Sequence, residues 1–258
     1  LEDYLPKGKK LPPIPKPVDA IDIPLIFPAF FTSIWDNLPQ PIISEKPGSF
    51  ETYNQDYGFI LYKTELPAGE AGKLIVTGLH DYATVFVNGS YVGTISRKEG
   101  DDAIDIPEIK TSNTVLEILV EGMGRISSGK DLQDRKGITD NVVLNGNELK
   151  NWQIYKLPID KKFIYELRSS GKTKRKPGVI FKGNVSLVIT GDTYFDMGNY
   201  SKGMVWVNGY NLGRYWNIGP QNRLFCPGMY LRKGMNEILI FDMHEVDPKP
   251  IAGFSKIE

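Results

Sequence analysis

One stretch of this 258-residue chain occurs twice. The first copy is Val85-Phe86-Val87-Asn88-Gly89-Ser90-Tyr91-Val92-Gly93, and the second is Val205-Trp206-Val207-Asn208-Gly209-Tyr210-Asn211-Leu212-Gly213, 120 positions later. In both copies, runs of β-branched and aromatic residues flank an Asn-Gly pair. Because that pair tolerates the positive φ angles of a type I′ turn, each copy predicts a β-hairpin.

The sequence around the two hairpins also consists of short, strand-like runs. Gly58 and Gly178 open such runs at the same spacing of 120, and Pro107 and Pro227 repeat that spacing. No long segment has the 3.6-residue periodicity of an amphipathic helix. Short strands separated by turns predict an all-β fold, and the spacing is too long for a solenoid repeat. We therefore expect two tandem β-sandwiches of jelly-roll type.

Composition suggests where the boundaries lie. Residues 1–35 begin with a proline-rich stretch, and proline fixes φ and lacks an N–H, so an extended connector is expected there. The first sandwich is expected over residues 36–160 and the second over residues 161–258. The basic segment 168–176 is poor in apolar residues and indicates a solvated loop rather than an anion site.

Charge and composition limit the possible partners. The chain has 31 basic and 31 acidic residues, which argues against nucleic acid or an anionic membrane, since both require a positive field. No apolar run approaches the roughly 20 residues that span a bilayer. The single cysteine, Cys226, cannot form an internal disulfide, and His80 and His244 lie too far apart in sequence for zinc-ligand spacing. The sequence has no phosphate-binding glycine loop, so no cofactor and no metal are expected.

An acidic stretch is the first group of residues that could carry chemistry. Glu99, Asp101, Asp102 and Asp105 could offer a carboxylate pair or oxygen ligands for calcium. The stretch lacks the ligand alternation of an EF-hand loop, and a loop is a poor platform for a catalytic pair. We expect neither catalysis nor a cation there.

Aromatic residues in the second hairpin are the other group. Aromatic rings stack on the C–H faces of sugars, and arginine and asparagine hydrogen-bond hydroxyl groups, so a weak sugar site is expected from Tyr210, Asn211, Arg214 and Trp216. The alternative is that these aromatic residues fill a core or a domain interface. Strand alternation places Trp206 on the opposite face from Val205 and Val207, and this favours the alternative.

Several motifs, in order along the chain, resemble one known family. They are Lys202 to Trp216 followed by Gly219-Pro220-Gln221, Asn54 to Gly58, Gly124-Arg125-Ile126, Asp134 to Ile138, Trp152 to Pro158, and the connector from Tyr4 to Pro15. Together they are similar to the C-terminal β-domains of glycoside hydrolase family 35 β-galactosidases. The resemblance covers nearly the whole chain and implies two jelly rolls of the galactose-binding-domain-like type.

The resemblance also carries functional implications. The family's whole enzyme has a (β/α)₈ barrel that removes terminal β-linked galactose with retention, using two glutamates of the barrel. No strand–helix alternation is visible here, so the barrel is absent and no catalytic residue is assigned. Residues 1–35 would connect this chain to the missing barrel. Where many members carry an aromatic residue at the galactose site, this sequence has Ser128, so Arg125 and Ser128 are weak candidates for the pocket rim.

These observations lead to three hypotheses about function. The first is a non-catalytic accessory region that packs on the catalytic barrel of the same polypeptide and shapes its substrate rim. The second is a free-standing carbohydrate-binding module that takes galactosides, and the third is a structural or adhesion spacer. A homo-oligomer is possible. The resemblance alone favours a periplasmic, secreted or lysosomal location.

Overall fold

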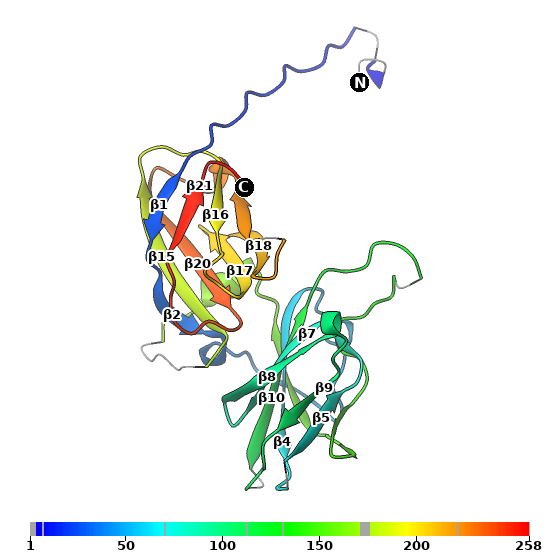
Figure 1. The fold of residues 1–258 in the computed structure, drawn as a ribbon. Coiled ribbons are helices and arrows are strands. Elements are labelled where there is room, and N and C mark those ends of the chain that lie inside the picture. The colour runs from blue at the N-terminus through cyan, green and yellow to red at the C-terminus, as the bar shows by residue number, and fades with distance from the viewer. Residues whose placement is uncertain are drawn as a thin grey trace.

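The computed structural model describes residues 4–6, 8–69, 71–111, 113–130, 132–170, 176–220 and 222–257. Parts of the expected connector (1–3 and 7), most of the basic segment (171–175) and Gln221 lie outside these ranges. The described chain forms two β-sandwiches, as the sequence predicted, drawn in cyan to green and in blue and yellow to red in Figure 1. Its one α-helix, α1 (Lys161–Glu166), follows the last strand of the first sandwich in sequence.

The first sandwich pairs a six-stranded sheet with a four-stranded one. The larger sheet has the order β3 (Ile42–Ser44), β14 (Trp152–Leu157), β4 (Gly58–Leu66), β10 (Thr114–Gly122), β7 (Tyr82–Val87), β8 (Ser90–Ser96). The smaller sheet has the order β13 (Asn147–Glu148), β12 (Val142–Leu144), β5 (Gly72–Val76), β9 (Ala103–Ile106). A two-stranded ribbon, β6 (Leu79–His80) with β11 (Gly137–Ile138), lies beside them.

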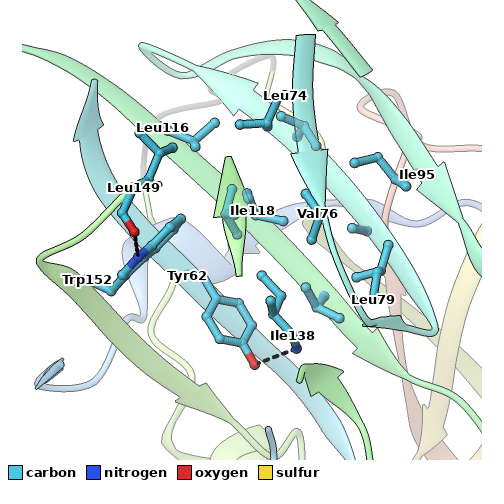
Figure 2. Packing of buried hydrophobic residues seen from close by; sticks show 14 of the residues in the cluster. Tyr62, Leu74, Val76, Leu79, Ile95, Leu116, Ile118, Ile138, Leu149 and Trp152 are labelled. Atoms are coloured by element: carbon cyan, nitrogen blue, oxygen red, sulfur yellow. Dashed lines mark hydrogen bonds between the residues drawn. The ribbon is translucent and has the colours of Figure 1, made fainter. Parts of the chain in front are cut away.

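Apolar side chains fill the space between these sheets (Figure 2). Trp152 and Tyr62 are the largest of them, and both place a polar atom inside the core. The Trp152 indole donates to the Leu149 carbonyl oxygen at 3.0 Å, and the Tyr62 hydroxyl accepts from the Ile138 amide at 3.3 Å. Because buried polar groups are costly unless paired, these bonds allow both side chains to lie inside the core.

The second sandwich is built in the same way. Its five-stranded sheet has the order β18 (Tyr210–Trp216), β17 (Lys202–Val207), β20 (Gly234–Asp242), β15 (Val179–Leu187), β2 (Ala29–Ser33). Its four-stranded sheet has the order β1 (Ile23–Ile26), β21 (Ile251–Phe254), β16 (Thr193–Asp196), β19 (Arg223–Cys226). Each of the two sandwiches thus has one larger and one smaller sheet.

The structure corrects the expected N-terminal boundary. Strands β1 and β2 pair with β21 and β15 of the second sandwich, so the end of the 1–35 segment is part of that domain rather than of a connector. Both strands lie at sheet edges, where Pro24 needs no ladder partner for its nitrogen. The proline content excluded a central strand but left room for two edge strands. The first sandwich is therefore inserted between segments of the second.

The two Asn-Gly hairpins are equivalent, as predicted. Asn88 and Asn208 both have φ of 49°, and the glycine after each also has positive φ. The Asn88 side chain accepts from the amide of Val115 on β10, and the Asn208 side chain accepts from the amide of Glu237 on β20. Each hairpin is therefore tied to the next strand of its sheet through the same asparagine.

The two larger sheets pack against each other at the junction of the sandwiches. Alternation along β17 directs Val205 and Val207 into the second sandwich and Trp206, which is 1% exposed, into the junction. The rings of Phe59 on β4 and Phe241 on β20 meet edge to face there, with centroids 5.1 Å apart. The preference for a domain interface over a sugar platform at Trp206 is therefore confirmed.

Candidate functional site

A long loop leaves the first sandwich near the junction. It begins after Gly122, the last residue of β10, and ends before Gly137, the first residue of β11, and it is the green loop that extends away from the lower sandwich in Figure 1. Arg125 and Ser128, the two candidates for the pocket rim, both belong to this β10–β11 loop, and the described residues from 124 to 133 are exposed.

A buried ion cluster holds the two ends of the loop together. The Lys136 side chain is 2% exposed, and its ammonium lies 2.8 Å from Asp81 and 2.7 Å from Asp134. The same Asp81 accepts from the amide of Met123 at 2.9 Å. One carboxylate, placed directly before β7, therefore binds the first and the last residue of the loop.

A second cation completes the cluster. The Arg97 guanidinium bonds Asp81 at 3.1 Å and Asp134 at 2.8 Å. Burial by itself raises the pKa of Asp134, but hydrogen bonds from Lys136 and Arg97 outweigh it and lower that pKa. The lowered pKa favours the ionised carboxylate that both cations bind.

Arg125 fastens the loop to another part of the same sandwich. Its guanidinium lies 2.6 Å from Glu51 and donates to the Asp56 carbonyl oxygen at 3.0 Å. Glu51 also accepts from the amide of Lys136. Arg125 therefore supports the loop, and Ser128, at the exposed part of the loop, is the candidate that faces solvent.

The second sandwich reaches the start of the loop through Arg214. Its guanidinium donates to the carboxylate of Glu121 at 2.8 Å and to the carbonyl oxygen of Gly122 at 2.7 Å. Glu121, which is 1% exposed, also pairs with the ammonium of Lys202 at 2.5 Å. The β17–β18 hairpin thus contributes two cations to the end of β10, across the junction.

Trp216 lies in the same region. Its ring meets Tyr82 edge to face at 5.5 Å, and the Lys202 ammonium lies 4.1 Å from its centroid. Together with Ser96 and His244 these residues line a cavity of about 330 Å³ between the sandwiches. His244 accepts from or donates to the Tyr82 hydroxyl at 2.9 Å, and burial lowers the pKa of this histidine.

Tyr210 and Asn211 lie elsewhere. They follow the turn of the second hairpin, where Tyr210 stacks on Tyr230 with centroids 4.3 Å apart and Asn211 accepts from the Gly213 amide at 2.6 Å. Trp216 lies six positions after Tyr210 along β18, a span of roughly 20 Å. The structure thus brings Arg214 and Trp216 close to the base of the loop and leaves Tyr210 and Asn211 at the far end of the hairpin.

Sequence reasoning missed the residues that build the loop base. Asp134 and Lys136 stood in a motif that resembled the family, but no spacing connected them with Asp81 or Arg97. The only available signal for the junction was that strand alternation puts Lys202 on the same face of its strand as Trp206, beside the hairpin strand that carries Arg214. Burial of opposite charges requires their pairing, yet which charges pair is a tertiary property.

Two absences hold for the described ranges. Among them no group of three or more His, Cys, Asp or Glu side chains is placed to hold a metal ion. Within the same ranges, no helix is both long and apolar enough to cross a membrane.

Comparison with known proteins identifies the domains. Residues 47–158 match the family model described as beta-galactosidase, first all-beta domain, and residues 179–236 match beta-galactosidase, galactose-binding domain. The chain therefore belongs to the β-galactosidase family and comprises C-terminal β-domains of its members.

Individual relatives agree with this assignment. A Xanthomonas manihotis protein named beta-galactosidase is 36% identical over 84% of this chain and 36% of its own length. The human beta-galactosidase-1-like protein 2 is 37% identical over 91% of this chain and 38% of its own length. The chain thus spans little more than a third of these relatives. A solved GH2 beta-galacturonidase from Eisenbergiella tayi overlaps with a TM-score of 0.30 at 15% identity, over 80% of this chain and 31% of that chain, too weakly to bear on function.

Proposed function

We propose that this chain is the non-catalytic accessory region of a β-galactosidase and that its β10–β11 loop forms part of the rim of the substrate pocket. The observation that carries the proposal is the construction of the loop. Asp81 fixes both ends, and Arg125 and Arg214 fasten it further, while the described residues from 124 to 133 stay exposed. A loop with a rigid base and an exposed tip suits a surface that must be positioned against another domain.

We assign the reaction itself to a catalytic domain outside this chain. Glycoside hydrolysis requires two carboxyl groups held across a sugar pocket, about 5–9.5 Å apart, with one free to protonate or attack. The carboxylates at the loop base, Asp81 and Asp134, are instead neutralised by Lys136 and Arg97. We therefore assign them to support of the loop, and the chain's contribution to the reaction is to orient substrate and exclude water.

Two measurements test the proposal. The purified 258-residue chain should not hydrolyse 4-nitrophenyl β-D-galactoside. In the complete enzyme that contains this chain, Ser128→Tyr should change KM or the substrate preference while the melting temperature stays constant, because Ser128 is exposed.

A matched control is available in the same sandwich. Ser90 is also exposed, but it lies in the β7–β8 hairpin, so Ser90→Tyr should leave the kinetics unchanged. Turnover by the isolated chain that is lost on substitution of one of its own carboxylates would refute the accessory role. Identical kinetics for Ser128→Tyr and the parent enzyme on short and long galactosides would refute the rim assignment.

A further inference from the structure

The outer face of the smaller sheet in the second sandwich carries a row of aromatic side chains. Tyr194 on β16 lies directly opposite Phe225 on β19 and, on its other side, opposite Phe254 on β21. The rings of Tyr194 and Phe225 have centroids 5.3 Å apart. Phe225 is 46% exposed and Phe254 is 38% exposed, so the row faces solvent across three strands.

The duplication within the chain provides an internal comparison for this face. In the first sandwich the equivalent pair of strands is β5 and β9, and the pair of residues opposite each other there is Lys73 and Asp105, both exposed. Asp105 precedes Phe225 by the same 120 positions that separate the two hairpins. The fold therefore does not require aromatic residues at this place, because its first copy uses charged ones.

Polar groups lie immediately beside the row. Arg223 lies opposite Asp196, and their side chains pair at 3.2 Å. The Arg223 guanidinium also lies 4.5 Å from the Phe254 ring centroid and donates to the Lys256 carbonyl oxygen at 3.2 Å. Three contacts hold this planar donor in place next to the aromatic row, and such preorganisation lowers the entropic cost of binding a ligand.

Two rings of the row, Tyr194 and Phe225, share one hollow with the ion pair. Tyr194, Asp196, Asn222, Arg223 and Phe225 line a cavity of about 700 Å³ that is open to solvent. Sites for small ligands are typically about 300–1,000 Å³ and combine apolar walls with a few placed polar groups. The hollow therefore has the size and lining of a ligand site.

The mixture of groups selects the class of ligand. Ring faces pack against the C–H face of a pyranose, whereas a guanidinium, a carboxylate and an amide exchange hydrogen bonds with its hydroxyl groups. A protein partner would have to desolvate the Arg223–Asp196 pair, which is costly, but sugar hydroxyls replace the water that these groups lose. We propose that the outer face of β16, β19 and β21 is a binding site for a neutral oligosaccharide.

This site is separate from the β10–β11 loop and belongs to the other sandwich. It binds sugar without cleaving it, and it would raise the local concentration of a polysaccharide near a linked catalytic domain. Its existence does not depend on the rim assignment, since the residues involved are different.

The test is titration of the 258-residue chain with lactose, β-1,4-galactotetraose, cellotetraose and maltotetraose. Binding is measured by calorimetry and by saturation-transfer NMR. Saturable binding of at least one of these sugars is expected. Tyr194→Ala and Phe225→Ala should each weaken it by about tenfold, the loss expected for one stacked ring. Tyr165→Ala, which removes an exposed ring on α1 outside this face, is the matched control and should leave binding unchanged.

Folding is controlled separately. Asp196→Asn keeps the shape of the side chain and should weaken sugar binding with an unchanged melting temperature, so a misfolded Tyr194→Ala does not leave the question open. Absence of binding to all four sugars would overturn the proposal. So would binding that is insensitive to Tyr194→Ala and Asp196→Asn, or self-association of the chain that Phe225→Ala abolishes.

Discussion

The ion pair between Glu121 and Lys202 is the most informative place to perturb the junction, because its two members are not equivalent. Both side chains are almost completely buried. Glu121 has two cationic partners, Lys202 at 2.5 Å and Arg214 at 2.8 Å. Among the described residues, Glu121 is the only acidic partner of Lys202. Removal of Glu121 therefore leaves a buried ammonium without a counter-charge, whereas removal of Lys202 leaves Glu121 paired with Arg214.

The expected energies differ accordingly. Glu121→Gln should lower the free energy of unfolding by about 4 kcal/mol, within the range for a buried pair that loses one partner. Lys202→Met should cost about 2 kcal/mol, the value of one hydrogen bond to a charged group. In the double variant no ammonium is left unpaired, so its cost should fall short of the sum by about 3 kcal/mol. For a chain of this length, Glu121→Gln corresponds to a decrease in melting temperature of about 10 °C.

Urea unfolding of the four proteins, followed by circular dichroism, measures these differences as one double-mutant cycle. Ionic strength should have little effect on the coupling, because salt screens buried pairs much less than exposed ones. The reasoning fails if Lys202→Met costs as much as Glu121→Gln, or if the two costs simply add.

Three further predictions use the same measurement of unfolding. Because burial lowers the pKa of His244, the unfolded chain binds the proton first as the pH falls, so the stability that the neutral histidine supports above about pH 6.5 is lost below that pH. His244→Gln should therefore lower the free energy of unfolding less at about pH 5 than at about pH 7.5. An equal loss at both pH values would contradict this. Asn208→Ala should lower the free energy of unfolding by about 4 kcal/mol and Asn88→Ala by about 2 kcal/mol. The reason is that, among the described residues, the Asn208 side chain makes three hydrogen bonds and the Asn88 side chain one. Equal losses would show that only the turn conformation matters. Thr84→Val should stabilise the chain by about 0.5–1 kcal/mol, because the buried Thr84 hydroxyl lacks a hydrogen-bond partner among the residues the structure describes, and a net loss would point to a bond with water there.

Local rules were sufficient wherever the determining interactions lie within a few residues. The Asn-Gly pairs predicted both hairpins because the φ angles of a type I′ turn restrict the residues that can occupy it. Alternation along β17 predicted that Trp206 and its two valine neighbours face opposite ways, because successive side chains in a strand point to opposite faces. The repeat at a constant spacing predicted two sandwiches of the same design.

Pairing between distant segments was decided by the tertiary structure alone. The prolines in residues 1–35 indicated only that this segment forms no helix and no central strand. Pairing of β1 with β21 and of β2 with β15 makes its end two edge strands of the second sandwich.

The same holds for the β10–β11 loop and for the aromatic face. Asp81 and Lys136 are far apart in sequence, and they meet because burial of either charge is unfavourable without the other. Tyr194, Phe225 and Phe254 form one row only because three strands lie in register. The sequence by itself thus determined which elements form and which way their side chains face, since backbone sterics and hydrophobic periodicity act locally. The tertiary structure decided which elements are neighbours, since that depends on contacts that no local rule contains.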